Sequence, residues 1–257
     1  MKQFILETEP KNGIVSLSGS GYRYLVLVRR MKKGDALNVR LPNGESAVSI
    51  IQEISGGTLT LQLTSIPASS PAAPISKKPA LILLQAMPKG SKLDLIVRQA
   101  AEVGITKVVP FFSKHCIKQD AGGWDAIGGR TDRLRRIVKE ARQQSGSAVL
   151  TELSEPLGMA GLFEYWRSIA EQSLGLLVYE LGSDLPSKLL TENAAVHGAS
   201  PPQQIVFAIG PEGGFAAEEA DLFIENGFKS ISLGSNILRV ETAALYAASA
   251  IQTLLNV

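Results

Sequence analysis

The sequence predicts a small all-β domain followed by a larger α/β domain. Short apolar runs separated by turn residues occupy the first 65 positions. A proline-rich stretch at 65–79 follows, and strand-like and helix-like patterns then alternate to the end of the chain. The 257 residues are 45% hydrophobic and 19% charged, which suffices for one or two packed cores and excludes a disordered or fibrous chain.

The first domain is predicted from six runs with strand-like alternation. Turn residues separate them, such as the Lys-Gly-Asp, Pro-Asn-Gly and Gly-Gly sequences at 33–35, 42–44 and 56–57. Six strands in about 65 residues are typical of a small β-barrel or sandwich. The runs are residues 4–6, 13–17, 24–30, 36–41, 47–54 and 58–63.

The second domain is predicted as an α/β domain with a mainly parallel sheet, because buried-type strands alternate with amphipathic helices. The expected strands are 80–86, 107–112, 174–179, 204–209 and 230–233. The expected helices are 93–103, with Gly104 as the C-cap, 130–144, 216–225 and 240–255. The proposed boundaries are 1–68 for the first domain, 69–79 for the linker and 80–257 for the second domain.

Several function classes are excluded by what the sequence lacks. One cysteine and two histidines exclude an internal disulfide and the usual zinc-ligand clusters, so no metal is expected. No apolar window is long enough for a membrane span, and the start MKQFILETEP turns acidic too early for a signal peptide. We therefore expect a cytoplasmic protein without a membrane partner. The Walker, GxGxxG and GxSxG motifs are also absent.

The charge distribution points to a polyanion partner. Residues 1–142 contain 22 Lys and Arg against 11 Asp and Glu, whereas residues 143–257 contain 4 against 13. Within the basic part, Arg135, Lys139 and Arg142 form a stripe at helical spacing. The alternative is that both halves are ordinary solvated surfaces and that the stripe is a solvated helix face.

Two glycine-bearing loops follow consecutive predicted strands and form a candidate ligand site. One is Gly-Pro-Glu-Gly-Gly at 210–214, and the other is the segment 234–239 that begins at Gly234. Ligands of parallel sheets bind outside the carboxyl ends of strands, and glycine permits positive φ and close approach to the backbone. The alternative is a pair of tight strand–helix turns. The acidic first turn at Glu218 and Glu219 disfavours a phosphate ligand here.

Four segments in the correct order resemble the RsmE family of 16S rRNA (uridine-N(3))-methyltransferases in the SPOUT superfamily. They are PKGSKLDLIVRQAAEVGITKVVP, KEARQQSG, FAIGPEGGF and LGSNILRVETA, and the resemblance covers essentially the whole chain. It implies a SPOUT-type domain with a C-terminal trefoil knot, preceded by a PUA-like β-barrel that binds RNA. It also implies S-adenosyl-L-methionine as cofactor, a homodimer, and methylation of one particular uridine of 16S rRNA in the small ribosomal subunit.

The resemblance and the loop chemistry together suggest residue roles. The cofactor would contact mainly backbone groups of Tyr179, Glu180, Ile209, Gly210, Pro211, Glu212, Gly213, Gly214, Leu233, Gly234, Ile237, Leu238 and Arg239. RNA would contact Arg29, Arg30, Lys32, Lys33, Lys89, Lys92, Arg135, Lys139 and Arg142. His115 and Cys116 are interpreted as structural or incidental.

Arg239 and Glu241 are the candidate catalytic residues. Arg239 would stabilise a uracil carbonyl or pair with Glu241, and Glu241 would accept the N3 proton or only favour its helix N-terminus. Glu212 would contact the ligand or be a surface acid.

The sequence departs from the family pattern at six positions. Arg23 and Tyr24 stand where the family usually has paired histidines. Ser147, Ser235, Asn236 and Val240 stand where the family usually has Arg, Pro, Arg and Thr. Two rival functions follow, a non-catalytic RNA-binding protein and a SPOUT enzyme that acts on tRNA or 23S rRNA.

Overall fold

The computed structural model describes residues 2–65, 78–116, 129–182 and 202–255. Most of the predicted linker lies outside these ranges. The chain forms two compact units, one of residues 1–76 with 142–148 and one of residues 77–141 with 149–257. Within the described residues, no helix is both long and apolar enough to cross a bilayer.

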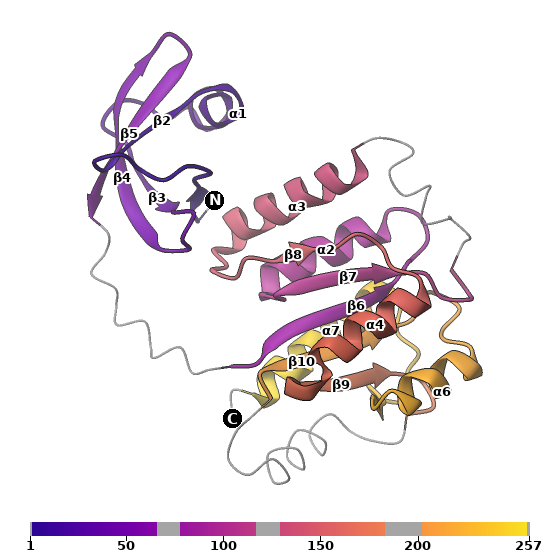
Figure 1. The fold of residues 1–257 in the computed structure, drawn as a ribbon. Coiled ribbons are helices and arrows are strands. Elements are labelled where there is room, and N and C mark those ends of the chain that lie inside the picture. The colour runs from indigo at the N-terminus through magenta and orange to yellow at the C-terminus, as the bar shows by residue number, and fades with distance from the viewer. Residues whose placement is uncertain (1, 66–77, 117–128, 183–201, 256–257) are drawn as a thin grey trace. The chain divides into compact units, whose positions relative to one another are not determined.

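The first unit contains a five-stranded sheet in the order β1-β3-β4-β5-β2 (Figure 1). The pairs are antiparallel apart from β1 with β3, and β4 changes register twice against β5. The strands are β1 (Phe4–Ile5), β2 (Ile14–Leu17), β3 (Ala36–Arg40), β4 (Ser46–Ser55) and β5 (Thr58–Ser65). Their inward side chains, among them Phe4, Val39 and Leu61, form one core.

The predicted strand at residues 24–30 is wrong. The chain there continues the short helix α1 (Gly19–Tyr22) into the π-helical segment η1 (Arg23–Val28). On a strand Leu25 and Leu27 would share a face, yet Leu25 is fully buried while Leu27 is 61% exposed. The Leu and Val run has strand propensity, but packing of one helical face on the core overrides it.

Residues 142–148 complete the first unit although they are distant in sequence. Gln3 Nε2 donates to the carbonyl oxygens of Arg142 (3.1 Å) and Ser147 (3.2 Å), and Arg40 Nε donates to Gln3 Oε1 (2.7 Å). Gln3 and Arg40 are both buried. The segment that departs from the family pattern at Ser147 is therefore part of the first unit's packing.

The second unit confirms the prediction of an α/β domain with a parallel sheet. Its six strands lie in the order β11-β9-β10-β6-β7-β8, and every pair is parallel. The strands are β6 (Ala80–Ala86), β7 (Lys107–Phe111), β8 (Glu152–Leu153), β9 (Ser173–Val178), β10 (Gln204–Ile209) and β11 (Lys229–Ile231). The central strands β6 and β10 are apolar and almost completely buried, as a sheet covered on both faces requires.

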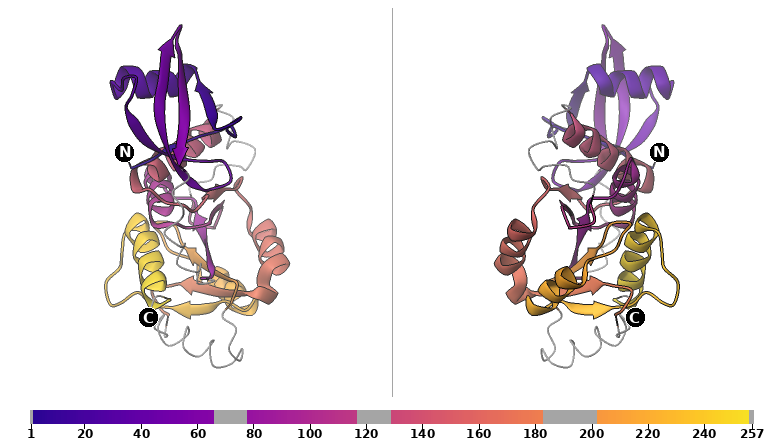
Figure 2. Two further views of the ribbon diagram at one scale, coloured as in Figure 1. Left: turned by 90° about the vertical axis from the view of Figure 1, so that its left-hand side faces the viewer. Right: turned by 90° about the vertical axis from the view of Figure 1, so that its right-hand side faces the viewer.

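Helices cover both faces of this sheet. Helices α2 and α7 pack against each other on one face, and α4 lies on the other (Figure 2). The helices are α2 (Lys92–Val103), α3 (Arg130–Ser145), α4 (Met159–Ile169), the short 3-10 helix η3 (Ala170–Gln172), α6 (Ala217–Glu225) and α7 (Val240–Leu254). Gly104 caps α2 with φ +82°, as predicted. Helix α4 and the two-residue strand β8 were not predicted.

Candidate functional site

Five loops follow the carboxyl ends of neighbouring parallel strands and contact one another at one edge of the sheet. They follow β6, β7, β9, β10 and β11, and the loop after β10 is 210–216. Its contacts reach the turn after β6 through Glu212 and the loop after β7 through Gly213 and Gly214. This edge is where parallel sheets bind ligands, because loop backbone groups are free of the strand ladder there.

The Glu212 carboxylate joins the loop after β10 to the turn after β6. The Lys89 backbone N–H donates to both carboxylate oxygens (3.1 and 3.2 Å), and Lys92 Nζ lies 2.8 Å from Oε1. Partial burial by itself raises the pKa of the Glu212 carboxyl. The hydrogen bonds from Lys92 and the backbone outweigh this effect, so the pKa lies below its ordinary value.

Lys92 lies between two carboxylates. Its Nζ is 3.7 Å from Glu241 Oε2, which is buried and has no hydrogen-bond partner among the described residues. The hydrogen bond to Glu212 raises the pKa of the Lys92 ammonium, and the charges of Glu212 and Glu241 raise it further. Lys92 thus links the loop after β10 to the first turn of α7.

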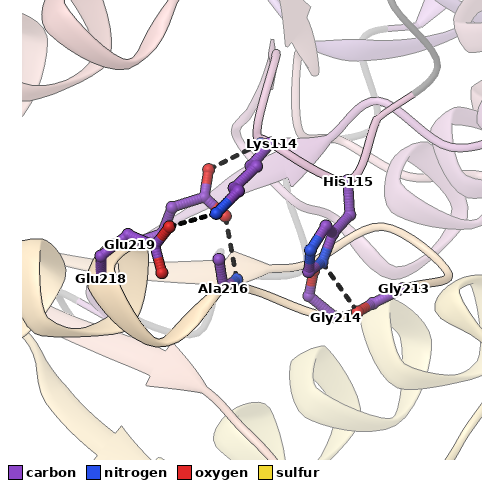
Figure 3. A network of polar contacts seen from close by, with 7 residues as sticks. All are labelled: Lys114, His115, Gly213, Gly214, Ala216, Glu218 and Glu219. Carbon is purple, nitrogen blue, oxygen red and sulfur yellow. Dashed lines mark hydrogen bonds and ion pairs between the residues drawn. The ribbon is translucent and has the colours of Figure 1, made fainter.

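A second network holds the loop after β10 from the side of β7 (Figure 3). Glu219 is 6% exposed and accepts two backbone N–H groups, from Lys114 (2.7 Å) and from Ala216 (3.0 Å). The Lys114 ammonium pairs with Glu218. His115 Nδ1 lies 3.0 Å from the Gly213 carbonyl oxygen and 3.2 Å from that of Gly214. The acidic first turn of α6 therefore serves capping and loop attachment.

The glycines of the two predicted loops differ in conformation. Gly214 (φ +67°) and Gly234 (φ +126°) adopt the positive φ that glycine permits, whereas Gly210 and Gly213 do not. At Gly210 and Gly213, the lack of room for a side chain favours glycine. A Cβ on Gly210 would lie 3.3 Å from backbone atoms of Gly214 and Phe215, and one on Gly213 would lie 3.1 Å from His115 Cβ.

The remaining predicted cofactor residues surround this edge with different exposure. Ile209 and Pro211 are buried beneath it, and Tyr179, Leu233 and Leu238 are half-buried. Glu180 is exposed and lies near Gly214, where a Cβ would be 3.4 Å from Glu180 Oε1. Ile237 is 90% exposed and Leu181, beside Glu180, is 77% exposed. The loops after β9 and β11 thus each expose one large apolar side chain to solvent.

Arg239 and Glu241 lie at the start of α7. Arg239 is the N-cap residue and is exposed, and it forms no ion pair with any described residue. The ion pair of Glu241 is with Lys92, so the alternative of an Arg239–Glu241 pair was wrong.

The predicted RNA contacts divide by exposure. Side chains of Arg29, Arg30, Lys32, Lys33, Lys89 and Arg135 are exposed, and those of Lys92 and Lys139 are half-buried. Arg142 is only 7% exposed, so it does not lie on an exposed basic stripe with Arg135 and Lys139 as expected. It packs in the first unit, where burial lowers the pKa of its guanidinium and the nearby Arg40 lowers it further.

The contacts of His115, Lys114 and Glu219 with the loop after β10 were not predicted. The loop after β7, which carries His115, also follows a parallel strand, but residues 112–116 contain no glycine to mark it. Glu219 had a usable signal, since an acid at the third helical position typically caps the N-terminus. No group of metal-ligating side chains occurs among the residues that the structure describes.

Two protein-family models match the chain and give its class, an RNA methyltransferase with an N-terminal PUA domain. A family model described as the RNA methyltransferase domain matches residues 76–252, and one described as the RNA methyltransferase PUA domain matches residues 17–64. The chain belongs to the ribosomal RNA small subunit methyltransferase E family.

Individual relatives agree with this assignment. The family's protein from Synechocystis sp. is 31% identical over 242 residues, which cover 94% of this chain and 73% of the relative. The Mycobacterium bovis protein is 27% identical over 259 residues, 98% of this chain and 91% of the relative. The solved Neisseria gonorrhoeae protein, bound to S-adenosyl methionine, has a TM-score of 0.76 at 24% identity over 99% of this chain and 98% of that one. This last likeness shows a shared fold.

The Glu212–Lys92 pair leads to a pH-dependent prediction. A carboxyl whose pKa is lowered by folding stabilises the protein above its unfolded-state pKa of about 4.3 and loses this contribution as pH falls through the folded-state value. Glu212→Gln is therefore expected to melt a few degrees below the wild type at neutral pH, and the gap should close on acidification below about pH 4.

Calorimetric melting between neutral and acidic pH measures the gap. Glu225→Gln, on an exposed residue of α6 without an ion pair among the described residues, controls for net charge. A gap that stays constant down to pH 3 would contradict the role of the carboxylate charge.

Proposed function

We propose that the protein transfers a methyl group from S-adenosyl-L-methionine to nitrogen-3 of a particular uridine of 16S rRNA in the small ribosomal subunit. One observation carries the proposal: relatives named ribosomal RNA small subunit methyltransferase E match nearly the whole chain, including the candidate loops. The same proposal places the activity in the cytoplasm, where ribosomes are assembled.

The loop chemistry fits this cofactor. An adenosine needs neutral hydrogen-bonding groups and apolar surface for its base. The loops after β10 and β11 offer backbone groups, and Leu181 and Ile237 offer exposed apolar surface. A Cβ on Gly234 would meet no atom of the described residues within 4 Å, so none of these residues blocks approach to this backbone. We assign cofactor contacts to the residues predicted above.

When bound, S-adenosylmethionine would supply an electrophilic methyl group, whose bond to the sulfonium sulfur breaks as the bond to N3 forms and leaves a neutral thioether. The residues of the chain must then orient the uracil and take its N3 proton, because the N3–H bond breaks as the N3–carbon bond forms. Glu241, half-buried in the first turn of α7 and paired with Lys92, is the residue that we assign to accept this proton, directly or through water. Arg239, which is exposed and forms no ion pair with the described residues, would stabilise a uracil carbonyl as negative charge develops.

RNA affinity is assigned to the exposed basic residues of each unit. Arg29, Arg30, Lys32 and Lys33 follow η1 in the first unit, and Arg135 is exposed on α3. Phosphate contacts by such side chains supply affinity and orientation. Lys92 is assigned to the cofactor side, since it already pairs with two carboxylates.

Two further properties belong to the proposal. A homodimer would cover the exposed Leu95 on α2 and Tyr246 on α7, two helices that pack together. A C-terminal trefoil knot, which the resemblance to the family implies, is also part of the proposal.

Labelled methyl transfer tests the proposed reaction. Purified protein and radiolabelled S-adenosylmethionine are incubated with small subunits from a strain that lacks the modification. Large subunits and tRNA serve as competing substrates, and nucleoside mass spectrometry identifies the product. We expect label only in small subunits, as 3-methyluridine. No transfer to any RNA would favour the non-catalytic alternative, and label in tRNA or 23S rRNA would favour the other SPOUT alternative.

A further inference from the structure

His115 contacts the backbone of the loop after β10 at two adjacent peptide groups. Its Nδ1 lies within hydrogen-bond distance of both the Gly213 and Gly214 carbonyl oxygens, as Figure 3 shows. Carbonyl oxygens only accept, so Nδ1 carries the proton and donates. A Cβ on Gly213 would lie 3.1 Å from His115 Cβ, which means that the side chain rests directly on the loop.

These two hydrogen bonds fix more than the carbonyl groups. In a trans peptide the C=O and N–H groups point to opposite sides, so two held carbonyls also set the directions of the Gly214 and Phe215 N–H groups. The Gly214 N–H donates to the Pro211 carbonyl oxygen (2.9 Å), which closes a turn within the loop. The imidazole therefore determines the orientation of the backbone proposed to contact the cofactor.

The loop after β7, which carries His115, is held in place by its own hydrogen bonds and packing. Glu219 bonds the N–H groups of Lys114 and Ala216, so the loop after β7 and the start of α6 are joined. Phe215 is 5% exposed and stacks with Phe111 at the end of β7. With both flanks fixed, His115 holds the Gly214–Phe215 peptide through the Gly214 carbonyl oxygen. It also reinforces the Gly213–Gly214 peptide, whose N–H the Pro211 carbonyl oxygen already accepts.

We propose that His115 is a positioning residue of the cofactor loop, whose Nδ1–H holds the Gly213 and Gly214 peptides in the orientation that binds S-adenosylmethionine. The cofactor part of this inference rests on the proposed function, whereas the loop part does not. His115 itself is not assigned a contact with the cofactor.

Three substitutions at His115 distinguish the effect of the Nδ1–H donor from the effect of the volume of the ring. Asn places an amide N–H close to the position of Nδ1, Gln places one close to that of Nε2, and Ala removes both. We expect His115→Ala and His115→Gln to weaken S-adenosylmethionine binding about fivefold to tenfold, the loss of about one net hydrogen bond. His115→Asn should stay within about twofold of the wild type. Isothermal titration gives the affinities.

Hydrogen exchange without cofactor tests the loop directly. Amides at 210–216 should exchange several-fold faster in His115→Ala and His115→Gln than in the wild type and in His115→Asn. Lys114→Met is the matched control, because it removes the exposed pair with Glu218 and keeps the imidazole. Melting temperatures confirm that every variant is folded.

The outcomes distinguish this inference from the proposed function. An unchanged exchange rate of the loop amides in His115→Ala would overturn the inference. An exchange rate in His115→Gln as slow as that in His115→Asn would also overturn it. If exchange rises as expected while the wild type binds no S-adenosylmethionine, the positioning of the loop stands and the proposed cofactor is wrong.

Discussion

Arg239→Ala is expected to slow methyl transfer by about 10²–10³-fold at saturating cofactor and small subunit, as the removal of one preorganised donor to a developing negative charge typically does. The structure gives the physical reason. Arg239 is exposed at the N-cap of α7 without an ion pair among the described residues, so its guanidinium is available to substrate. Single-turnover methylation measures the chemical step, because saturating conditions suppress binding defects.

The matched control is Arg167→Ala on α4, a helix that carries none of the proposed site residues. It removes the same exposed guanidinium and should keep the wild-type rate. A loss below about fivefold in Arg239→Ala, roughly 1 kcal/mol, would remove Arg239 from the catalytic residues and direct attention to Glu241. A loss of cofactor affinity without a loss of rate would assign Arg239 to binding alone.

Gly182→Ala is expected to destabilise the protein by about 3 kcal/mol or more, the upper range for overpacking a filled site. A Cβ there would lie 2.5 Å from the Ile231 carbonyl carbon and 2.6 Å from its oxygen. The backbone cannot easily move away, because the Tyr179 N–H donates to the Ile231 carbonyl oxygen and the Gly182 N–H donates to that of Tyr179, each at 3.0 Å. For a unit of this size the melting temperature should fall by about 10 °C.

Gly161→Ala is the matched control within the same unit. Gly161 lies in α4, and its Cβ would make ordinary contacts with the Leu157 side chain at 3.8 and 3.9 Å. Replacing a helical glycine by alanine should stabilise the protein by about 0.5–1 kcal/mol. We therefore expect Gly182→Ala to lower the melting temperature and Gly161→Ala to raise it in the same experiment. A Gly182→Ala protein that melts with the wild type would contradict the close approach of the chain to β11.

Elements with strong local patterns could be predicted from the sequence. The strand at 80–86 and the strand at 204–209 agree with β6 and β10 at both ends, because continuous apolar runs suit only buried strands of that length. Helix α2 was found by its periodicity and by Gly104 at its end. The prediction failed at residues 24–30, where local propensity favours a strand and packing of Leu25 on the first core produces a helix.

Only part of the candidate site could be predicted from the sequence, for a similar reason. Gly214 and Gly234 could be picked out from the sequence because both have a positive φ, which favours glycine. This backbone conformation is set within the loop itself. The partners of Glu212, Glu219 and Glu241 are not local. Lys92 is 120 residues before Glu212 in sequence, so their pairing depends on β6 lying beside β10 in the sheet.

Local periodicity and turn chemistry were therefore enough for the fold class, most elements and the loops that carry the candidate site. Strand order, which places the loops after β6, β7 and β10 together, came only from the folded chain. The same holds for His115 on the Gly213–Gly214 peptides, Arg142 within the first unit, and Gly182 against β11. The physical reason is that side-chain periodicity encodes which face of an element is buried, whereas the neighbour on that face is selected by the packing of the whole chain.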